Sequence, residues 1–78
     1  MPPLPVLSGR EIVKILERCG YVVMRRESSH IRLACLGRRS VTVPDYRIVS
    51  KGLMRKILRD AILSVDEFNY LRKGKNQA

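Results

Sequence analysis

The sequence predicts a small α+β domain of two layers, in which helices cover one face of a three-stranded antiparallel sheet. Three observations support this prediction. The chain has 78 residues, which is the length of one small domain. Apolar residues recur at helical spacing near both ends of the chain, and three short segments between them are β-prone or alternate between apolar and polar residues. Tight connections between these segments favour a meander, so the expected order of elements is α-β-β-β-α-α.

The first helix is predicted over residues 9–19. Ser8 at the N-cap and Glu11 three residues later form a capping box, in which each side chain accepts a backbone N–H of the first turn. Gly20 is suited to end the helix, because glycine readily adopts the left-handed conformation found there. The apolar side of this helix is assigned to the core and consists of Ile12, Val13, Ile15, Leu16 and Cys19.

The three strands are predicted at residues 21–24, 30–35 and 40–43. The polar segment 25–29 is predicted to turn the chain, and Pro44 to end the third strand, because proline donates no hydrogen bond to a sheet. In the second strand, Ile31 is on the face expected to meet the helices. Alternation then puts His30 and Arg32 on the opposite face, which is expected to remain open.

A second helix is predicted to begin at Lys51 with Ser50 as its N-cap. A shorter third helix is predicted to begin at the capping box of Ser64 and Glu67 and to run through Leu71. These elements divide the chain into an extended lead-in, a single domain and a polar tail, at residues 1–7, 8–72 and 73–78.

The chain is strongly basic, with 16 Lys and Arg against 7 Asp and Glu and a net charge of +9, while 45% of its residues are apolar. The apolar content predicts a folded domain rather than a disordered basic tail. The charge predicts a polyanionic partner, which is RNA, DNA or an acidic protein surface. The sequence has neither the roughly 20 apolar residues of a membrane span nor a secretory signal at its start. We therefore expect a cytoplasmic protein without a membrane partner.

Both cysteines, Cys19 and Cys35, fall in apolar patterns, which predicts buried free thiols rather than a disulfide. A zinc site that joined them to His30 would lack a fourth ligand. The sequence also has no glycine-rich nucleotide-binding motif and no serine-nucleophile motif. We therefore expect no metal and no cofactor.

His30, the sole histidine, is the candidate catalytic residue. Imidazole exchanges protons near neutral pH, and RNA carries its own nucleophile, the 2′-hydroxyl. A histidine that removes the hydroxyl proton, beside Arg25, Arg26 and Arg32 on the phosphate, suffices for a minimal ribonuclease. The alternative is a surface histidine that only contacts phosphate or water.

The remaining cations suggest a nucleic-acid surface without distinguishing RNA from DNA. Those in predicted turns or loops are Arg25, Arg26, Arg38, Arg39 and Arg47, and those on one side of the second helix are Arg55, Lys56 and Arg59. The cations of the first helix are interleaved with glutamates and indicate a solvated side. Lys51 opens the second helix, whose first N–H groups are suited to a phosphate.

Six short motifs follow one another along the chain, namely Cys19-Gly20-Tyr21, Ser29-His30, Val41-Thr42-Val43-Pro44, Lys51-Gly52-Leu53, Arg55-Lys56-Ile57-Leu58 and Leu63-Ser64-Val65-Asp66-Glu67-Phe68. In this order and spacing they resemble the HicA (YcfA-like) mRNA interferase toxins of type II toxin–antitoxin systems. The resemblance covers Ser8 to Leu71.

The resemblance implies a fold similar to that of double-stranded-RNA-binding domains. It implies a histidine-dependent, metal-independent ribonuclease that cleaves mRNA, with the family's catalytic histidine at His30, and a HicB-type antitoxin that masks this histidine. The candidate RNA-binding residues are Arg25, Arg26, Ser29, Arg32, Lys51, Arg55 and Arg59. The alternative is a non-catalytic RNA-binding module on the same fold.

The sequence departs from the family pattern in two respects. Ser28 replaces the glycine that usually precedes Ser-His, and Ile31 replaces a frequent second histidine. The family also often has a histidine soon after the Val-Pro of the third strand, and the stretch Pro44-Asp45-Tyr46 has none. Serine reaches positive φ less readily than glycine, so we expect a different turn before His30. A second proton-transfer group would have to be Tyr46, Lys51 or water.

Overall fold

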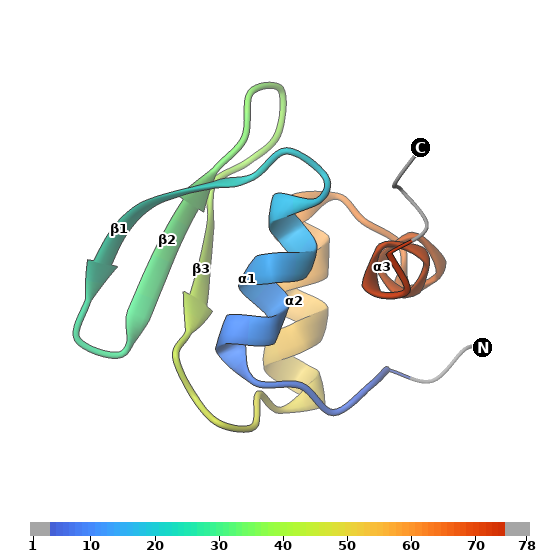
Figure 1. Cartoon of the computed structure of the whole chain (residues 1–78), viewed down its shortest axis with the longest axis horizontal. Helices are drawn as coiled ribbons and strands as arrows, with labels where there is room; N and C mark the ends of the chain where they lie inside the picture. The colour runs from blue at the N-terminus through green and yellow to red at the C-terminus, as the bar shows by residue number, and fades with distance from the viewer. Residues whose placement is uncertain (1–3, 75–78) are drawn as a thin grey trace.

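The computed structural model describes residues 4–74 as three helices and a three-stranded sheet (Figure 1). The elements in chain order are α1 (Gly9–Glu17), β1 (Val22–Glu27), β2 (His30–Ala34), β3 (Val41–Pro44), α2 (Lys51–Ala61) and α3 (Val65–Arg72). This order confirms the predicted α+β class. Residues 1–3 of the lead-in and 75–78 of the predicted tail lie outside the described residues.

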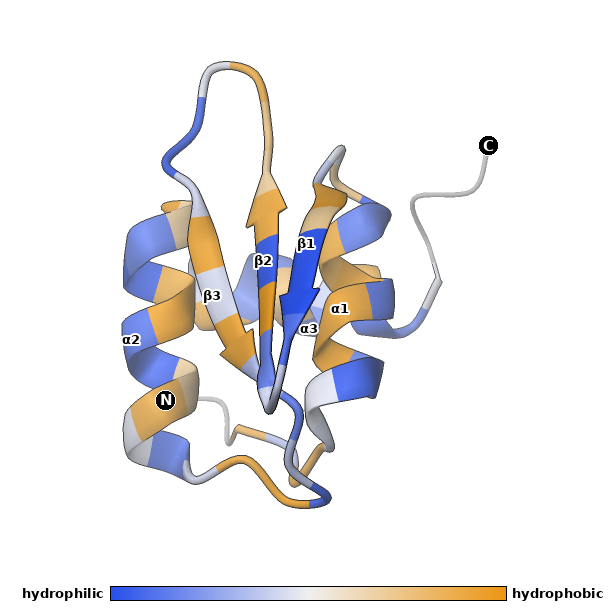
Figure 2. Ribbon diagram, turned by 90° about the vertical axis from the view of Figure 1, so that its left-hand side faces the viewer, coloured by the Kyte–Doolittle hydropathy of each residue, from blue (hydrophilic) through white to orange (hydrophobic). Residues whose placement is uncertain are grey.

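The sheet has the order β1-β2-β3, and both pairs are antiparallel. Helices α1 and α2 cover one face, and α3 lies on their far side from the sheet (Figures 1 and 2). Ile31 and Leu33 are buried beneath the helices, whereas His30 and Arg32 are exposed on the other face. The prediction of an open face that carries His30 is therefore confirmed.

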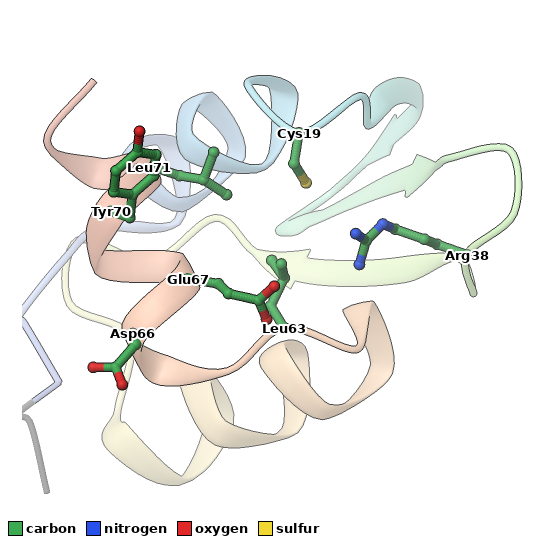
Figure 3. Close-up of a pocket in the computed structure, with 7 residues that line it drawn as sticks. All are labelled: Cys19, Arg38, Leu63, Asp66, Glu67, Tyr70 and Leu71. Atoms are coloured by element: carbon green, nitrogen blue, oxygen red, sulfur yellow. The ribbon is translucent and has the colours of Figure 1, made fainter. Parts of the chain in front are cut away.

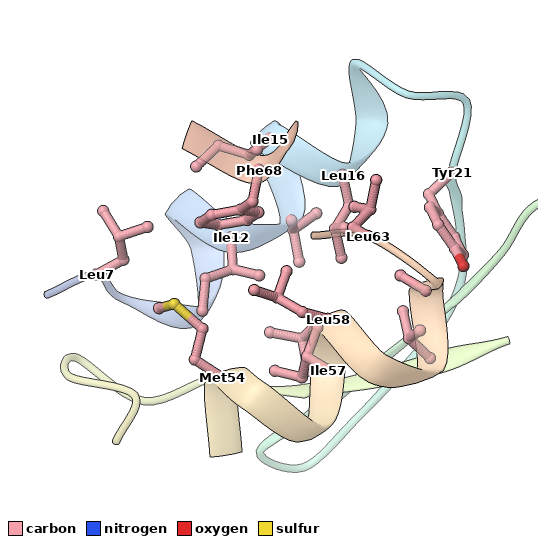
Figure 4. Packing of buried hydrophobic residues seen from close by; sticks show 14 of the residues in the cluster. Leu7, Ile12, Ile15, Leu16, Tyr21, Met54, Ile57, Leu58, Leu63 and Phe68 are labelled. Atoms are coloured by element: carbon pink, nitrogen blue, oxygen red, sulfur yellow. The ribbon is translucent and has the colours of Figure 1, made fainter. Parts of the chain in front are cut away.

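The hydrophobic core lies between the sheet and the helices. Phe68 of α3 is fully buried beside Ile12 and Ile15 of α1, which fixes α3 against the rest of the domain (Figure 4). Tyr21 is 2% exposed, and its hydroxyl donates to the carbonyl of Arg39 at 2.7 Å. The core also includes Leu4, Leu7, Val13, Leu16, Ile31, Leu33, Val41, Val43, Val49, Met54, Ile57, Leu58, Ala61, Leu63 and Leu71.

The predicted capping boxes of α1 and α3 are both present. In α1 the backbone N–H of Ser8 donates to Glu11 at 2.9 Å, and the Ser8 hydroxyl accepts the Glu11 N–H at 3.1 Å. Hydrogen bonds from Ser8 lower the pKa of Glu11. The stability that these hydrogen bonds contribute is therefore fully present above the ordinary pKa of glutamate. It is lost as the pH falls through the lowered pKa of Glu11. Ser50 caps α2 as predicted.

Strand β1 is longer than predicted, because it continues to Glu27. Arg25 and Arg26 therefore lie in the strand and not in a turn, and the turn itself is Ser28-Ser29. Pairing with β2 satisfies the backbone of these polar residues, which overrides their low strand propensity. The register shifts between Val23 and Arg25, so that Met24 forms a bulge.

Ser28 has a φ of 50°, so the serine adopts the left-handed conformation that glycine reaches more readily. Pairing of the flanking strands holds the residue in this conformation. Replacing Ser28 with glycine is expected to raise the free energy of unfolding by about 0.5–1 kcal/mol, because glycine carries no left-handed penalty but loses more entropy on folding. Urea unfolding measures the change. Ser29→Gly is the control and is expected to destabilise; equal effects of the two substitutions would contradict the explanation.

Two arginines hold the ends of helices instead of facing a nucleic acid. Arg38 donates from Nη1 to the carbonyls of Ala61 and Ile62 at 2.6 and 3.3 Å, at the end of α2. Arg18 donates to the carbonyls of Leu71 and Arg72 at 2.6 and 3.1 Å, at the end of α3. The assignment of Arg38 to the nucleic-acid surface is therefore corrected, because its guanidinium satisfies carbonyl groups that a helix end leaves unpaired.

We expect Arg38→Gln to lower the free energy of unfolding by about 1–2 kcal/mol, since charged hydrogen bonds to partly buried carbonyls are lost. The neighbouring Arg39→Gln is a matched control, because the Arg39 side chain is exposed and only its carbonyl is used. Thermal and urea unfolding measure both variants. A loss of stability in Arg39→Gln as large as that in Arg38→Gln would count against the capping role.

Cys19 and Cys35 are free thiols, as predicted, but both are only partly buried. Burial raises the pKa of the Cys19 thiol. Among the described residues, no group of histidine, cysteine or acidic side chains is arranged to hold a metal ion. Within residues 4–74, no helix has the length and apolar character needed to cross a bilayer.

Candidate active site

His30 is the first residue of the central strand β2, directly after the Ser28-Ser29 turn. Its partners in the sheet register are Glu27 on β1 and Pro44 on β3. Cross-strand partners share one face of a sheet, so Glu27 projects on the open side with the imidazole. The fold therefore presents the sole histidine of the chain at one end of the open face, beside a carboxylate.

A shallow cavity of about 350 Å³ lies at His30. Arg32 is the next residue of β2 on the same face, and its register partners are Arg25 on β1 and Thr42 on β3. A row of two guanidinium groups and a hydroxyl thus crosses the sheet beside the histidine. The cavity is lined by Arg25, Glu27, Ser28, His30, Arg32 and Thr42.

The cavity carries an excess of positive charge, with one carboxylate among the cations. The Arg25 Nη1 lies 3.6 Å from Glu27 Oε2, and both side chains are well exposed. Such an exposed pair is weak and is readily exchanged for a ligand phosphate. The site therefore combines a proton carrier, a carboxylate and two guanidinium groups, which suits the binding and cleavage of a phosphodiester.

The structure brings only part of the predicted set together at His30. Arg25 and Arg32 line the cavity, whereas Arg26 pairs with buried Ile31 and therefore lies on the helix-covered side of the sheet. The earlier grouping of Arg26 with His30 is corrected. Three more predicted contacts are exposed on α2 and do not line the cavity, namely Lys51, Arg55 and Arg59.

Ser29 acts through its backbone, since its carbonyl accepts the N–H of Asp45 at 2.7 Å. Asp45 also accepts Arg10 Nε at 3.2 Å. The N–H of Gly9 donates to the carbonyl of Tyr46 at 2.8 Å. The turn before His30 is thus tied to the end of β3 and to the start of α1, which holds the histidine in place.

Glu27 was not found from the sequence, because it fell in the segment predicted to turn. Of the groups considered as partners of the histidine, neither Tyr46 nor Lys51 lines the cavity, whereas Glu27 does. The two-residue spacing of Arg25 and Glu27 puts them on one face of an extended strand, but only the pairing with β2 shows that this is the face of His30.

A second and larger cavity, of about 410 Å³, lies between the end of α1 and α3 (Figure 3). Its walls are mostly apolar and include Leu63, Leu71 and the ring of Tyr70, with Cys19 and Arg38 at one side. It contains no histidine, and its arginine is the one that caps α2. The combination of a histidine with two arginines is therefore found in the cavity at the sheet and not in this one.

The family described as "HicA toxin of bacterial toxin-antitoxin" matches residues 9–63, which is more than half of the chain. The chain belongs to the HicA toxin family. The matched segment contains the whole cavity at His30. A solved structure described as a toxin–antitoxin complex from Streptococcus pneumoniae is 29% identical and superposes with a TM-score of 0.65. The alignment covers 73% of this chain and 98% of that chain.

A comparison with curated protein sequences finds no match. Membership of the HicA family and the structural likeness to a chain of a toxin–antitoxin complex therefore provide the biological context of the site. The HicA match ends at residue 63, before α3 begins at Val65, so the third helix of this protein lies beyond the segment that carries the family signal.

Proposed function

We propose that this HicA-family protein is the toxin of a toxin–antitoxin pair and cleaves mRNA as a metal-independent endoribonuclease. The proposal rests on one observation: His30 shares a cavity on the open sheet face with Arg25, Arg32 and Glu27. These groups are the ones that a phosphodiester cleavage through the 2′-hydroxyl requires.

In the proposed reaction, His30 accepts the proton of the 2′-hydroxyl as that oxygen attacks the phosphorus. A 2′,3′-cyclic phosphate forms, and the bond to the 5′-oxygen breaks with a proton taken from water. Arg25 and Arg32 hold the phosphate and offset the charge that develops on its oxygens. Glu27, across the strand pair, stabilises the imidazolium that results.

The partner in this proposal is a HicB-type antitoxin that covers the open face and masks His30. Two observations support it. The similar solved structure is a toxin–antitoxin complex, and the cavity carries an excess of positive charge to which an acidic segment is complementary. A shallow site on an open sheet face is also one that a second protein can cover completely.

The alternative is a non-catalytic RNA-binding module, and one specific observation favours it. The position of the family's frequent second histidine is Ile31, which is 1% exposed and faces the core. His30 therefore has no histidine partner in the chain. Glu27 fills this role in the proposed enzyme.

Incubating the purified protein with a structured mRNA, with and without EDTA, separates these functions. We expect cleavage in both conditions, with 2′,3′-cyclic phosphate ends that mass spectrometry identifies. Binding without any cleavage would favour the non-catalytic module. Cleavage that EDTA abolishes would contradict the metal-independent mechanism.

A further inference from the structure

A second cationic cavity lies on the other side of β1 from His30. It has a volume of about 320 Å³ and lies between α1 and β1. We call it the α1–β1 groove, and its lining residues are Arg10, Val13, Lys14, Glu17 and Arg26. Three of these five side chains are cationic and one is acidic.

The groove follows from the geometry of β1. Arg25 and Arg26 are consecutive in the strand, so their side chains project on opposite faces. Arg25 faces the cavity at His30, and Arg26 faces α1. Helix α1 packs more extensively against β3 than against β1. Lys14 of the helix and Arg26 of the strand both line the cavity between these two elements.

The charges of the groove are largely available to a ligand. Neither Lys14 nor Arg26 forms an ion pair with any residue in the described range 4–74. Arg10 is bound to Asp45 at 3.2 Å, but the Arg10 side chain remains well exposed. Arg18 and Arg38 differ, because their guanidinium groups are engaged by helix ends.

The two cationic cavities flank a single strand at the edge of the sheet. Strand β1 pairs only with β2, so its other edge is free of the sheet. A phosphate chain that crosses this edge passes from Arg25 and Arg32 on the open face to Arg26 and Lys14 in the α1–β1 groove. We propose that the groove binds phosphates of the same RNA strand that is cleaved at His30, an inference that rests on the proposed function.

The lining of the groove favours RNA over an acidic protein as its occupant. Val13 is its only apolar lining residue and is itself buried, so the groove offers little apolar surface. Phosphates are bound by exposed cations alone, whereas a stable protein interface also needs a buried apolar centre, which a protein partner would have to find outside this groove. The alternative occupant is an acidic segment of a protein partner, and the test must distinguish it from RNA.

The test compares two variants that each remove two positive charges. Lys14→Gln/Arg26→Gln alters the groove, and Arg72→Gln/Lys73→Gln is the control, since both residues are exposed at the end of α3 and line neither cationic cavity. Binding of a single-stranded RNA is measured at several salt concentrations in a His30→Gln background, so that the RNA stays intact. Cleavage of this RNA and of a dinucleoside monophosphate is measured with His30 present.

We expect the groove variant to bind the RNA more weakly. The slope of log affinity against log salt concentration should become shallower by about 1.4, because two phosphate contacts are lost and each contributes about 0.7 on a single strand. Its cleavage of the RNA falls, whereas its cleavage of the dinucleoside monophosphate, which carries one phosphate, is unchanged. The control variant should keep most of the slope. Lys14→Glu alone provides a second groove variant if the double variant is poorly folded by circular dichroism.

Three outcomes overturn the proposal. RNA binding with equal slopes in the groove and control variants rejects the groove but leaves the proposed function intact. Absence of RNA binding and cleavage in the unaltered protein rejects the proposed function and the groove with it. Loss of oligo-glutamate peptide binding in the groove variant, with RNA binding unchanged, assigns the groove to an acidic protein.

Discussion

Replacing His30 with glutamine is expected to lower the rate of RNA cleavage by about 10²–10⁴-fold, which is the usual contribution of a positioned general base. Glutamine keeps a polar side chain of similar reach but cannot accept the proton of the 2′-hydroxyl. The imidazole is exposed at the start of β2, so the fold should be retained. Single-turnover cleavage of a labelled mRNA measures the effect, and growth arrest on expression reports it in cells.

RNA affinity is the control for this substitution. We expect His30→Gln to bind RNA nearly as well as the unaltered protein, because Arg25 and Arg32 remain in the cavity. Arg32→Gln should differ from His30→Gln, because it removes a phosphate contact. We expect it to weaken RNA binding as well as to slow cleavage. Unchanged cleavage and growth arrest in His30→Gln would show that the assigned role is wrong.

Replacing Gly9 with alanine is expected to lower the free energy of unfolding by about 2–4 kcal/mol, in the range of severe overpacking. A Cβ at this position would overlap the carbonyl oxygen of Pro44 and crowd Asp45. Backbone surrounds the position, so no flexible side chain can move to make room. Urea unfolding at equilibrium measures the loss of stability.

Gly52→Ala in α2 is a matched control, because a Cβ there would meet no atom within 4 Å. We expect it to raise the free energy of unfolding by about 0.5–1 kcal/mol, since alanine loses less entropy than glycine in a helix. Gly9→Ala should also slow RNA cleavage at temperatures where the variant is folded, because Pro44 is a register partner of His30. A Gly9→Ala protein as stable as Gly52→Ala would contradict the close approach.

Local signals were sufficient to predict the helices. Each capping box needs only two residues three positions apart, so Ser8 and Glu11 predict the start of α1 whatever the rest of the chain does. The alternation within β2 is equally local, and it put His30 on the open face correctly. The fold class followed from the order of these elements.

The parts that the sequence did not predict depend on contacts between distant segments. Simple alternation from Val23, which packs against the core, would direct Arg25 and Glu27 toward the helices. The bulge at Met24 reverses this phase, and only pairing with β2 reveals it. Arg38 likewise looked like a loop cation, because its acceptors at the end of α2 are more than 20 residues away in sequence.

The same bulge at Met24 has a consequence for how molecules of this protein meet each other. An exposed edge strand is a template on which a strand of another chain can add, and this is a common route to aggregation. The Met24 bulge interrupts the regular row of N–H and C=O groups along β1 and increases its twist. Arg25, Arg26 and Glu27 then put charge on the remainder of the strand. The edge is thereby protected against sheet-to-sheet association between copies of the chain.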